Sequence, residues 1–117
     1  MDNVGILHPG DMGISVAASA RNGGHTVYWV SEGRSSQTRE RAEKHGLVDA
    51  GTLAHLCEVC SVILSVCPPA AAETVARDVL AQGFTGLYVD ANAIAPQRAE
   101  HIGQLMSEAG ARFVDGG

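Results

Sequence analysis

Apolar runs typical of buried strands alternate with helical patterns along the whole chain. The strand-like runs cover residues 3–7, 25–30, 61–66, 86–91 and 111–115, with a very short sixth run at 47–49. The helical patterns cover residues 11–24, 35–46, 68–83 and 95–110, and one or two helical turns are expected after residue 49. Because parallel strands need long crossover connections, usually helices, this alternation predicts a parallel sheet with helices on both faces.

Right-handed crossovers would make the chain a doubly wound α/β domain of the Rossmann type. The sheet would have six strands, or five if the run at 47–49 does not pair. A length of 117 residues suits a single domain.

Charge and hydropathy argue against several classes of partner. The net charge of −5 disfavours nucleic acid and acidic membranes as main partners. No apolar run approaches the roughly 20 residues that a membrane-spanning helix needs. The start of the chain, MDNVGILHPG, lacks the basic region of a signal peptide and enters a strand pattern at once. We therefore expect a cytoplasmic protein with reduced cysteines.

Cys57 and Cys60 form a C-x-x-C pair in the stretch HLCEVC. His45 and His55 are nearby in sequence, but the spacing fits no common four-ligand zinc site. A thioredoxin-like redox pair is a second alternative. The favoured interpretation is that both cysteines are small buried residues that lead into the next strand.

Five polar or glycine-containing stretches each follow a predicted strand: HPGDMG, SEGRSS, CPP, NAIAP and DGG. In doubly wound sheets, ligands bind at the carboxyl ends of the strands, where the strand order reverses. All five stretches should therefore meet at one edge of the sheet, and we expect the binding site there.

The first stretch has the form of a glycine-rich phosphate loop with one glycine replaced. In the pattern G-x-G-x-x-G, Gly10 and Gly13 take the second and third glycine positions, and His8 takes the first. The second glycine admits a pyrophosphate, and the following helix N-terminus offers N–H groups and partial positive charge. The alternative is a plain β–α turn without a ligand. The residues that we assign to a dinucleotide here are His8, Pro9, Gly10, Asp11, Met12 and Gly13.

The stretch after the second strand bears on the choice between NAD and NADP. A carboxylate there binds the ribose hydroxyls of NAD, whereas an arginine accommodates the 2′-phosphate of NADP. Glu32 favours NAD, while Arg34 with Ser31 and Ser35 could cradle a phosphate. We expect NADP, with NAD as the alternative, provided that Glu32 points away and pairs with Arg34 or Arg39.

Taken together, these motifs resemble the N-terminal domain of the 6-phosphogluconate dehydrogenase and β-hydroxyacid dehydrogenase superfamily. The matching stretches are VGILHPGDMG, GGHTV, VILSVCPP, YVDANAIAP and GARFVDGG, in the family's order and over nearly the whole chain. The HPGxMG loop is similar to that of an uncharacterised dehydrogenase-like branch. The resemblance implies an oxidoreductase that transfers a hydride between nicotinamide and a small hydroxy acid or similar substrate.

The resemblance also implies roles for single residues. The segment Gly10–Gly13 would line the pyrophosphate. Val66, Cys67 and Pro68 would lie against the adenine side of the cofactor. The residues implied at the substrate are Asn92, Asp115, Gly116 and Gly117, with Asn92 also near the nicotinamide ribose. The chain departs from the family pattern at His8 and at DANA, where the family has D-x-S-T.

Enzymes of this family carry an all-helical second domain with a catalytic lysine. The one lysine here, Lys44, lies on a polar helix and is interpreted as solvent-exposed, so no catalytic residue is assigned. We expect residues 1–117 to be a dinucleotide-binding domain cut before that second domain, inactive alone, with homodimers formed through the second domain. The alternative is a stand-alone nucleotide-binding or regulatory module without catalysis.

Overall fold

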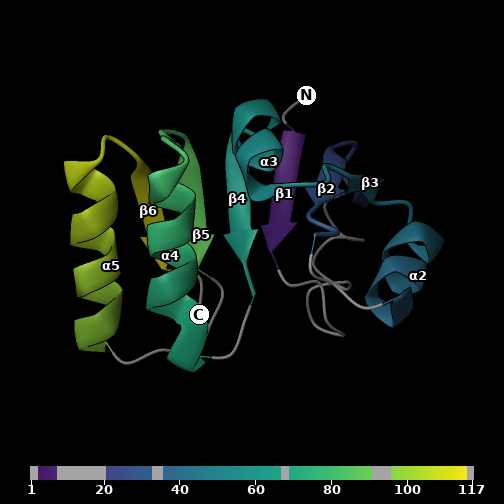
Figure 1. Ribbon diagram of the computed structural model, residues 1–117. Coiled ribbons are helices and arrows are strands. Elements are labelled where there is room, and N and C mark those ends of the chain that lie inside the picture. Colours follow the sequence, from purple (N-terminus) through teal and green to yellow (C-terminus); the bar gives the residue numbers. More distant parts are fainter. Residues whose placement is uncertain (1–2, 8–20, 33–35, 67–68, 91–95, 116–117) are drawn as a thin grey trace.

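The computed structural model describes residues 3–7, 21–32, 36–66, 69–90 and 96–115 of the chain (Figure 1). The strands are β1 (Asn3–Leu7), β2 (Thr26–Trp29), β3 (Val48–Asp49), β4 (Val62–Ser65), β5 (Leu87–Asp90) and β6 (Arg112–Asp115). The helices are α2 (Ser36–Lys44), α3 (Leu53–Val59), the 3-10 turn η1 (Pro69–Ala71), α4 (Ala72–Ala81) and α5 (Pro96–Glu108). None of the helices in these ranges is long and apolar enough to cross a membrane.

Six strands of the described chain form one sheet in the order β3-β2-β1-β4-β5-β6, and every neighbouring pair is parallel (Figure 1). β1 is central, with Val4 opposite Val27 of β2 on one side and opposite Val62 of β4 on the other. The run at 47–49 does pair, because Trp29 lies opposite Asp49. The expected doubly wound parallel sheet is confirmed, with six strands rather than five.

Most described elements begin and end within two residues of their expected bounds, and one difference has a physical cause. The expected helix at 68–83 starts as the 3-10 turn η1, because the cap residue Ala71 has no side-chain acceptor for the free N–H groups of α4. Of the helix expected at 11–24, residues 11–20 lie outside the described part of the chain. Arg21 and Asn22 are helical, and Gly24, with φ 90°, donates its N–H to the Arg21 carbonyl at 2.9 Å.

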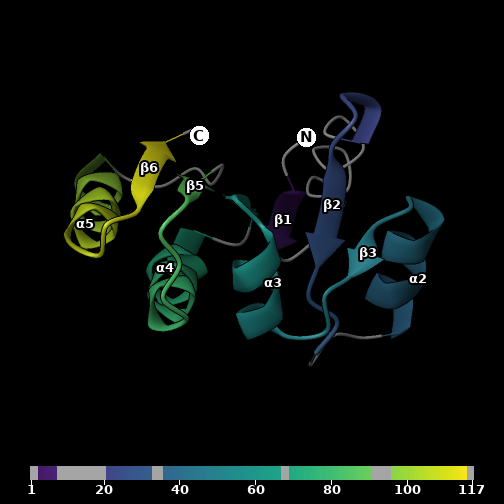
Figure 2. The ribbon, with the colours of Figure 1, turned by 90° about the horizontal axis from the view of Figure 1, so that it is seen from above.

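Alternate strand residues face opposite sides of the sheet and build two apolar clusters. Leu7, Ile63 and Tyr88 face α3, α4 and α5, which Figure 2 shows together along one side of the sheet. Ile6 and its neighbours face the other side. The second cluster comprises Ile6, Val27, Trp29, Leu47 and Ala42, the last of which is on α2. The helices therefore cover both faces, as the sheet's parallel strands require.

Gly5 allows α3 to pack directly on the central strand. A Cβ at this position would lie 2.5 Å from Cδ2 of Leu56, whose side chain is fully buried. α3 begins at a Thr52 cap, whose Oγ1 accepts the His55 N–H at 3.2 Å. The cap sets where the helix starts, and the missing side chain of Gly5 sets how closely it approaches β1.

Cys57 lies on α3, and Cys60 caps its carboxyl end with an N–H donated to the Leu56 carbonyl at 3.0 Å. Burial raises the pKa of the Cys57 thiol to about 11. Burial, and next the neighbouring Cys57, raise the pKa of Cys60 to about 12. Within the described ranges, no group of three or more His, Cys, Asp or Glu side chains could hold a metal. These protonated thiols favour the interpretation as packing residues, since metal ligands and nucleophiles are thiolates.

Gly5→Ala should destabilise the fold by about 1–3 kcal/mol, because the added methyl group overpacks against Leu56. Leu56→Ala alone should cost about 2–5 kcal/mol through the cavity it leaves. In the double variant the new methyl group has room, so the loss should be smaller than the sum of the two. Urea unfolding of the four proteins measures this, and strictly additive losses would contradict the contact.

Alkylation of native Cys57 by iodoacetamide at pH 8 should be about 100-fold slower than in the urea-unfolded chain, because its pKa is about two units higher. The native rate should rise about tenfold per pH unit towards pH 10. Since the fold raises the thiol pKa, this group's contribution to stability is complete below pH 9 and is lost as the pH rises towards 11. Mass spectrometry of the peptide gives the rates, and rapid labelling at pH 7 would revive the redox alternative.

Candidate functional site

The strand order reverses beside β1, at the carboxyl edge of the sheet. From β1 the chain continues to β2 and β3 on one side, and it then returns to β4 on the other side. Leu7 and Ser65 end these neighbouring strands opposite each other. At such a switch point the connections leave in opposite directions, which opens a crevice outside the strand ends. This edge is therefore the candidate site.

A row of paired residues crosses the sheet at this edge. Leu7 lies opposite Ser65, Ser65 opposite Asp90, and Asp90 opposite Asp115. Ser65 and Asp90 are fully buried, although the sheet's other fully buried positions are apolar or aromatic. Since buried polar groups are costly unless satisfied, this pair marks a place where the fold holds polar atoms in fixed positions. Val66 follows Ser65 directly, and the predicted residue Asn92 comes two positions after Asp90.

The ends of β2 and β3 form a second, more exposed part of the edge. The Ala50 N–H donates to the Trp29 carbonyl at 2.8 Å, and the Glu32 N–H donates to the Gly51 carbonyl at 3.1 Å. These bonds fix the backbone on which the exposed Glu32 and the half-buried Ser31 stand. The edge thus carries an exposed carboxylate on a fixed backbone just after the second strand.

A charged pair lies beside this backbone. Nη1 of Arg39, on α2, is 3.9 Å from Oδ2 of Asp49, and Oδ1 of Asp49 accepts the Gly51 N–H at 2.7 Å. The sequence left open whether Arg39 pairs with Glu32. In the described part of the chain, the ion pair that Arg39 makes is with Asp49 and not with Glu32.

Several predicted site residues can be located in the structure. Ser31 and Glu32 follow β2, Val66 follows β4 and is half-buried, and the backbone of Asp115 ends β6. All four stand at the carboxyl edge, where they were expected. The others lie outside the described residues and stay predictions: His8, Pro9, Gly10, Asp11, Met12, Gly13, Arg34, Ser35, Cys67, Pro68, Asn92, Gly116 and Gly117.

The sequence reasoning did not select Ser65, Asp90 or Asp49 for the site. The signal for the first two was present, because each is the one polar residue that ends an apolar strand. The signal for Asp49 was absent, because its partner Arg39 is ten positions away on α2 and only the packing of α2 beside β3 brings the two together.

The residues at this edge fit a dinucleotide. The switch point offers the crevice, the exposed Glu32 carboxylate suits ribose hydroxyls, and the half-exposed Arg39 guanidinium suits a phosphate. The buried pair Ser65 and Asp90 lies farther along the edge, on the β4–β5 side. Exposed charged groups and buried polar groups therefore occupy different halves of the same edge.

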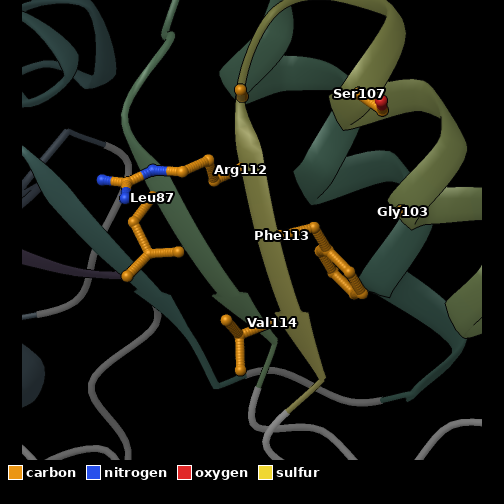
Figure 3. Close-up of a pocket in the computed structure, with 7 residues that line it drawn as sticks. Leu87, Gly103, Ser107, Arg112, Phe113 and Val114 are labelled. Atoms are coloured by element: carbon orange, nitrogen blue, oxygen red, sulfur yellow. The ribbon is translucent and has the colours of Figure 1, made fainter.

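An open groove elsewhere on the molecule is not this site. It runs along β6 and is lined by Leu87, Gly103, Ser107, Ala111, Arg112, Phe113 and Val114. Figure 3 shows Arg112 and Val114 on the side of Leu87, with Phe113 turned towards α5. The groove lies at the outer strand of the sheet, separated from β1 by β5 and β4. It therefore lies away from the switch point.

Comparison with known proteins shows the family of this chain. The family model of the NAD binding domain of 6-phosphogluconate dehydrogenase matches residues 3–117. A conserved protein of unknown function, described as similar in structure to 3-hydroxyacid dehydrogenases, is 30% identical with a TM-score of 0.85, over 97% of this chain and 42% of that one. No curated protein matches the sequence.

Two enzymes share the fold at lower identity. For 3-hydroxyisobutyrate dehydrogenase of Mycobacterium tuberculosis, solved with L-serine, the TM-score is 0.83 at 20% identity, over 97% of this chain and 39% of that one. For an imine reductase of Myxococcus stipitatus in complex with NADP+, the TM-score is 0.81 at 18% identity, over 95% of this chain and 39% of that one. A variant of that enzyme is solved with NAD+.

The chain spans about two fifths of the length of these solved proteins. The family match covers almost every residue of the chain and coincides with a sheet whose strand order reverses beside β1, the strand that the predicted glycine-containing loop follows in sequence. The expected resemblance is confirmed, and the nicotinamide dinucleotide is the cofactor class of the family. The chain belongs to the family of NAD-binding domains of 6-phosphogluconate dehydrogenase.

Proposed function

We propose that this chain is the cofactor-binding part of an oxidoreductase that moves a hydride between nicotinamide and a small hydroxy acid or a similar substrate. The observation that carries the proposal is the family match over residues 3–117. The names of two structural neighbours, a 3-hydroxyisobutyrate dehydrogenase and an imine reductase, support nicotinamide-dependent chemistry on a small polar substrate.

The bound nicotinamide would supply the hydride chemistry, and the residues of this chain would bind and orient it. The N–H groups of the loop from Gly10 to Gly13 would hold the pyrophosphate at the start of the following helix. Ser31 and Glu32 would face the adenosine ribose, and Val66 with its loop would cover the adenine. This assignment uses the carboxyl edge from β2 to β4.

The substrate would meet the other half of the edge. Asn92 and the segment Asp115 to Gly117 would contact it beside the nicotinamide. Ser65 is the last residue of β4 and Asp90 the last residue of β5, and both are fully buried. We assign to these two residues the positioning of the loops that follow their strands. Holding a substrate in one orientation is a large part of what such a site contributes to a rate.

We further propose NADP as the preferred cofactor, with Arg34 contacting the 2′-phosphate. Support comes from Arg34 and Ser35, which follow β2 in the stretch SEGRSS. The ion pair of Arg39 with Asp49 leaves Arg34 as the remaining expected partner of the exposed Glu32. An exposed carboxylate can turn into solvent when a phosphate binds, and its repulsion is screened by water and salt.

The purified chain should bind NADPH more tightly than NADH, as measured by the change in nicotinamide fluorescence on titration. Arg34→Ala should weaken NADPH binding about 10- to 100-fold and leave NADH binding unchanged, because it removes charged hydrogen bonds to one phosphate. The matched control is Arg112→Ala, at the amino end of β6 and away from the site. Equal affinities for the two cofactors, or a preference unchanged by Arg34→Ala, would contradict NADP.

The 117-residue chain should bind the cofactor without turning over 3-hydroxy acids. Its one lysine, Lys44, is exposed on α2, and no other residue is assigned to proton transfer. A spectrophotometric assay of NADP+ reduction at 340 nm measures turnover. The same protein preparation is titrated with cofactor to show that it binds. Steady turnover by the chain would show that it holds its own catalytic acid or base. Failure to bind either dinucleotide would favour another role.

A further inference from the structure

The pair formed by Arg39 and Asp49 lies at the place where the two outer strands end. Asp49 is the last residue of β3 and lies opposite Trp29, the last residue of β2. Trp29 packs in the same cluster as Ala42 of α2, so its side chain points to the sheet face that α2 covers. Asp49 lies opposite Trp29 in the register, so its side chain points to the same face. Arg39 is on α2 itself, in the segment that follows the predicted NADP-selecting loop.

The same region is tied to the backbone of Glu32. Asp49 accepts the Gly51 N–H, and the Gly51 carbonyl accepts the Glu32 N–H. A chain of two hydrogen bonds therefore connects the Asp49 carboxylate to the residue that faces the adenosine ribose in the proposed function. Through Asp49, Arg39 therefore lies close to the backbone of the residue that would face the adenosine ribose.

The ion pair itself is weak enough to be exchanged. The atoms Nη1 and Oδ2 are 3.9 Å apart, and the two side chains are 52% and 39% exposed. Exposed pairs of this kind stabilise proteins by about 0–1 kcal/mol. The two partners differ in freedom, because Asp49 is anchored by the 2.7 Å bond from Gly51 while the arginine is long and flexible.

A 2′-phosphate is the stronger partner for this guanidinium. It carries roughly two negative charges and presents three acceptor oxygens, which suit the planar fork of arginine. The carboxylate of Asp49 carries one charge and spends one oxygen on Gly51. Exchange of partners would give a phosphate contact at the loss of a weak ion pair.

We propose that Arg39 is a second cation for the 2′-phosphate of NADP. Asp49 pairs with the Arg39 guanidinium when no cofactor is bound and competes with the phosphate for this guanidinium. This inference rests on the proposed function. It adds to that function a specificity residue, Arg39, which lies on α2 and not in the loop after β2. It makes cofactor choice depend on β2, β3 and α2 together rather than on one loop.

Calorimetric titration with adenosine 2′,5′-bisphosphate and with 5′-AMP tests the contact, because the two ligands differ only in the 2′-phosphate. Arg39→Ala should weaken the bisphosphate about tenfold and leave 5′-AMP unchanged. Arg39→Lys should lie between, since lysine keeps the charge but not the fork. Arg77→Ala, on the surface of α4, is the matched control and should change neither affinity.

Asp49→Asn tests the competition. Asparagine keeps an oxygen that can accept the Gly51 N–H, but it removes the charge that attracts Arg39, so the bisphosphate should bind several-fold more tightly and 5′-AMP should not change. Tighter binding separates this role from a purely structural one, which would weaken both ligands. Thermal unfolding of each variant should stay within a few degrees of the original chain.

The outcomes separate the two proposals. If NADPH binds more tightly than NADH and Arg34→Ala abolishes that preference, but Arg39→Ala leaves the bisphosphate affinity unchanged, the role of Arg39 is overturned and the proposed function stands. Weaker bisphosphate binding by Asp49→Asn overturns the competition. If the original chain binds the bisphosphate no better than 5′-AMP, NADP preference and the role of Arg39 both fail.

Discussion

The parallel pairing of β1 with strands on both of its sides is the constraint on which the rest of this structure depends. Because β2 and β4 flank the same strand, the chain must leave one side of the sheet and return on the other. All carboxyl ends then meet at one edge. The buried residues Ser65 and Asp90 and the exposed ion pair of Arg39 with Asp49 occupy that edge together. The close packing of Leu56 on Gly5 keeps the central strand rigidly in place beneath α3.

The sequence predicted the fold well because the strands are short apolar runs separated by helical periodicity. The two-residue strand Val48–Asp49 carries almost no pattern of its own, and the sequence left open whether the run at 47–49 pairs. The helix start at Ala72 was not predicted. Its position depends on a cap without a hydrogen-bonding side chain, and the alanine-rich run gives no boundary signal.

The candidate site was predicted less completely, for a different reason. The stretch after β2 is conspicuous in the sequence, so Ser31 and Glu32 were expected at this edge, and the family resemblance pointed to Val66. The structure places all three there. Ser65 and Asp90 fall inside the expected strands 61–66 and 86–91 and were therefore not considered with the loops, whereas the sheet register places them side by side and fully buried. The approach of Arg39 to Asp49 depends on how α2 crosses the sheet, and no local pattern encodes that crossing.

The second apolar cluster has a consequence for motion at this edge. Ala42 is the fully buried side chain of α2, and the helix's other described side chains are exposed. A helix whose described side chains bury a single methyl group can unfold locally at a small fraction of the free energy that opens β1. Amide hydrogens of α2 should therefore exchange with solvent early, while those of the central strand wait for global unfolding. A ligand that bridges α2 to the end of β2 would raise the free energy of this local opening by mass action, so binding and local order would be coupled in one helix.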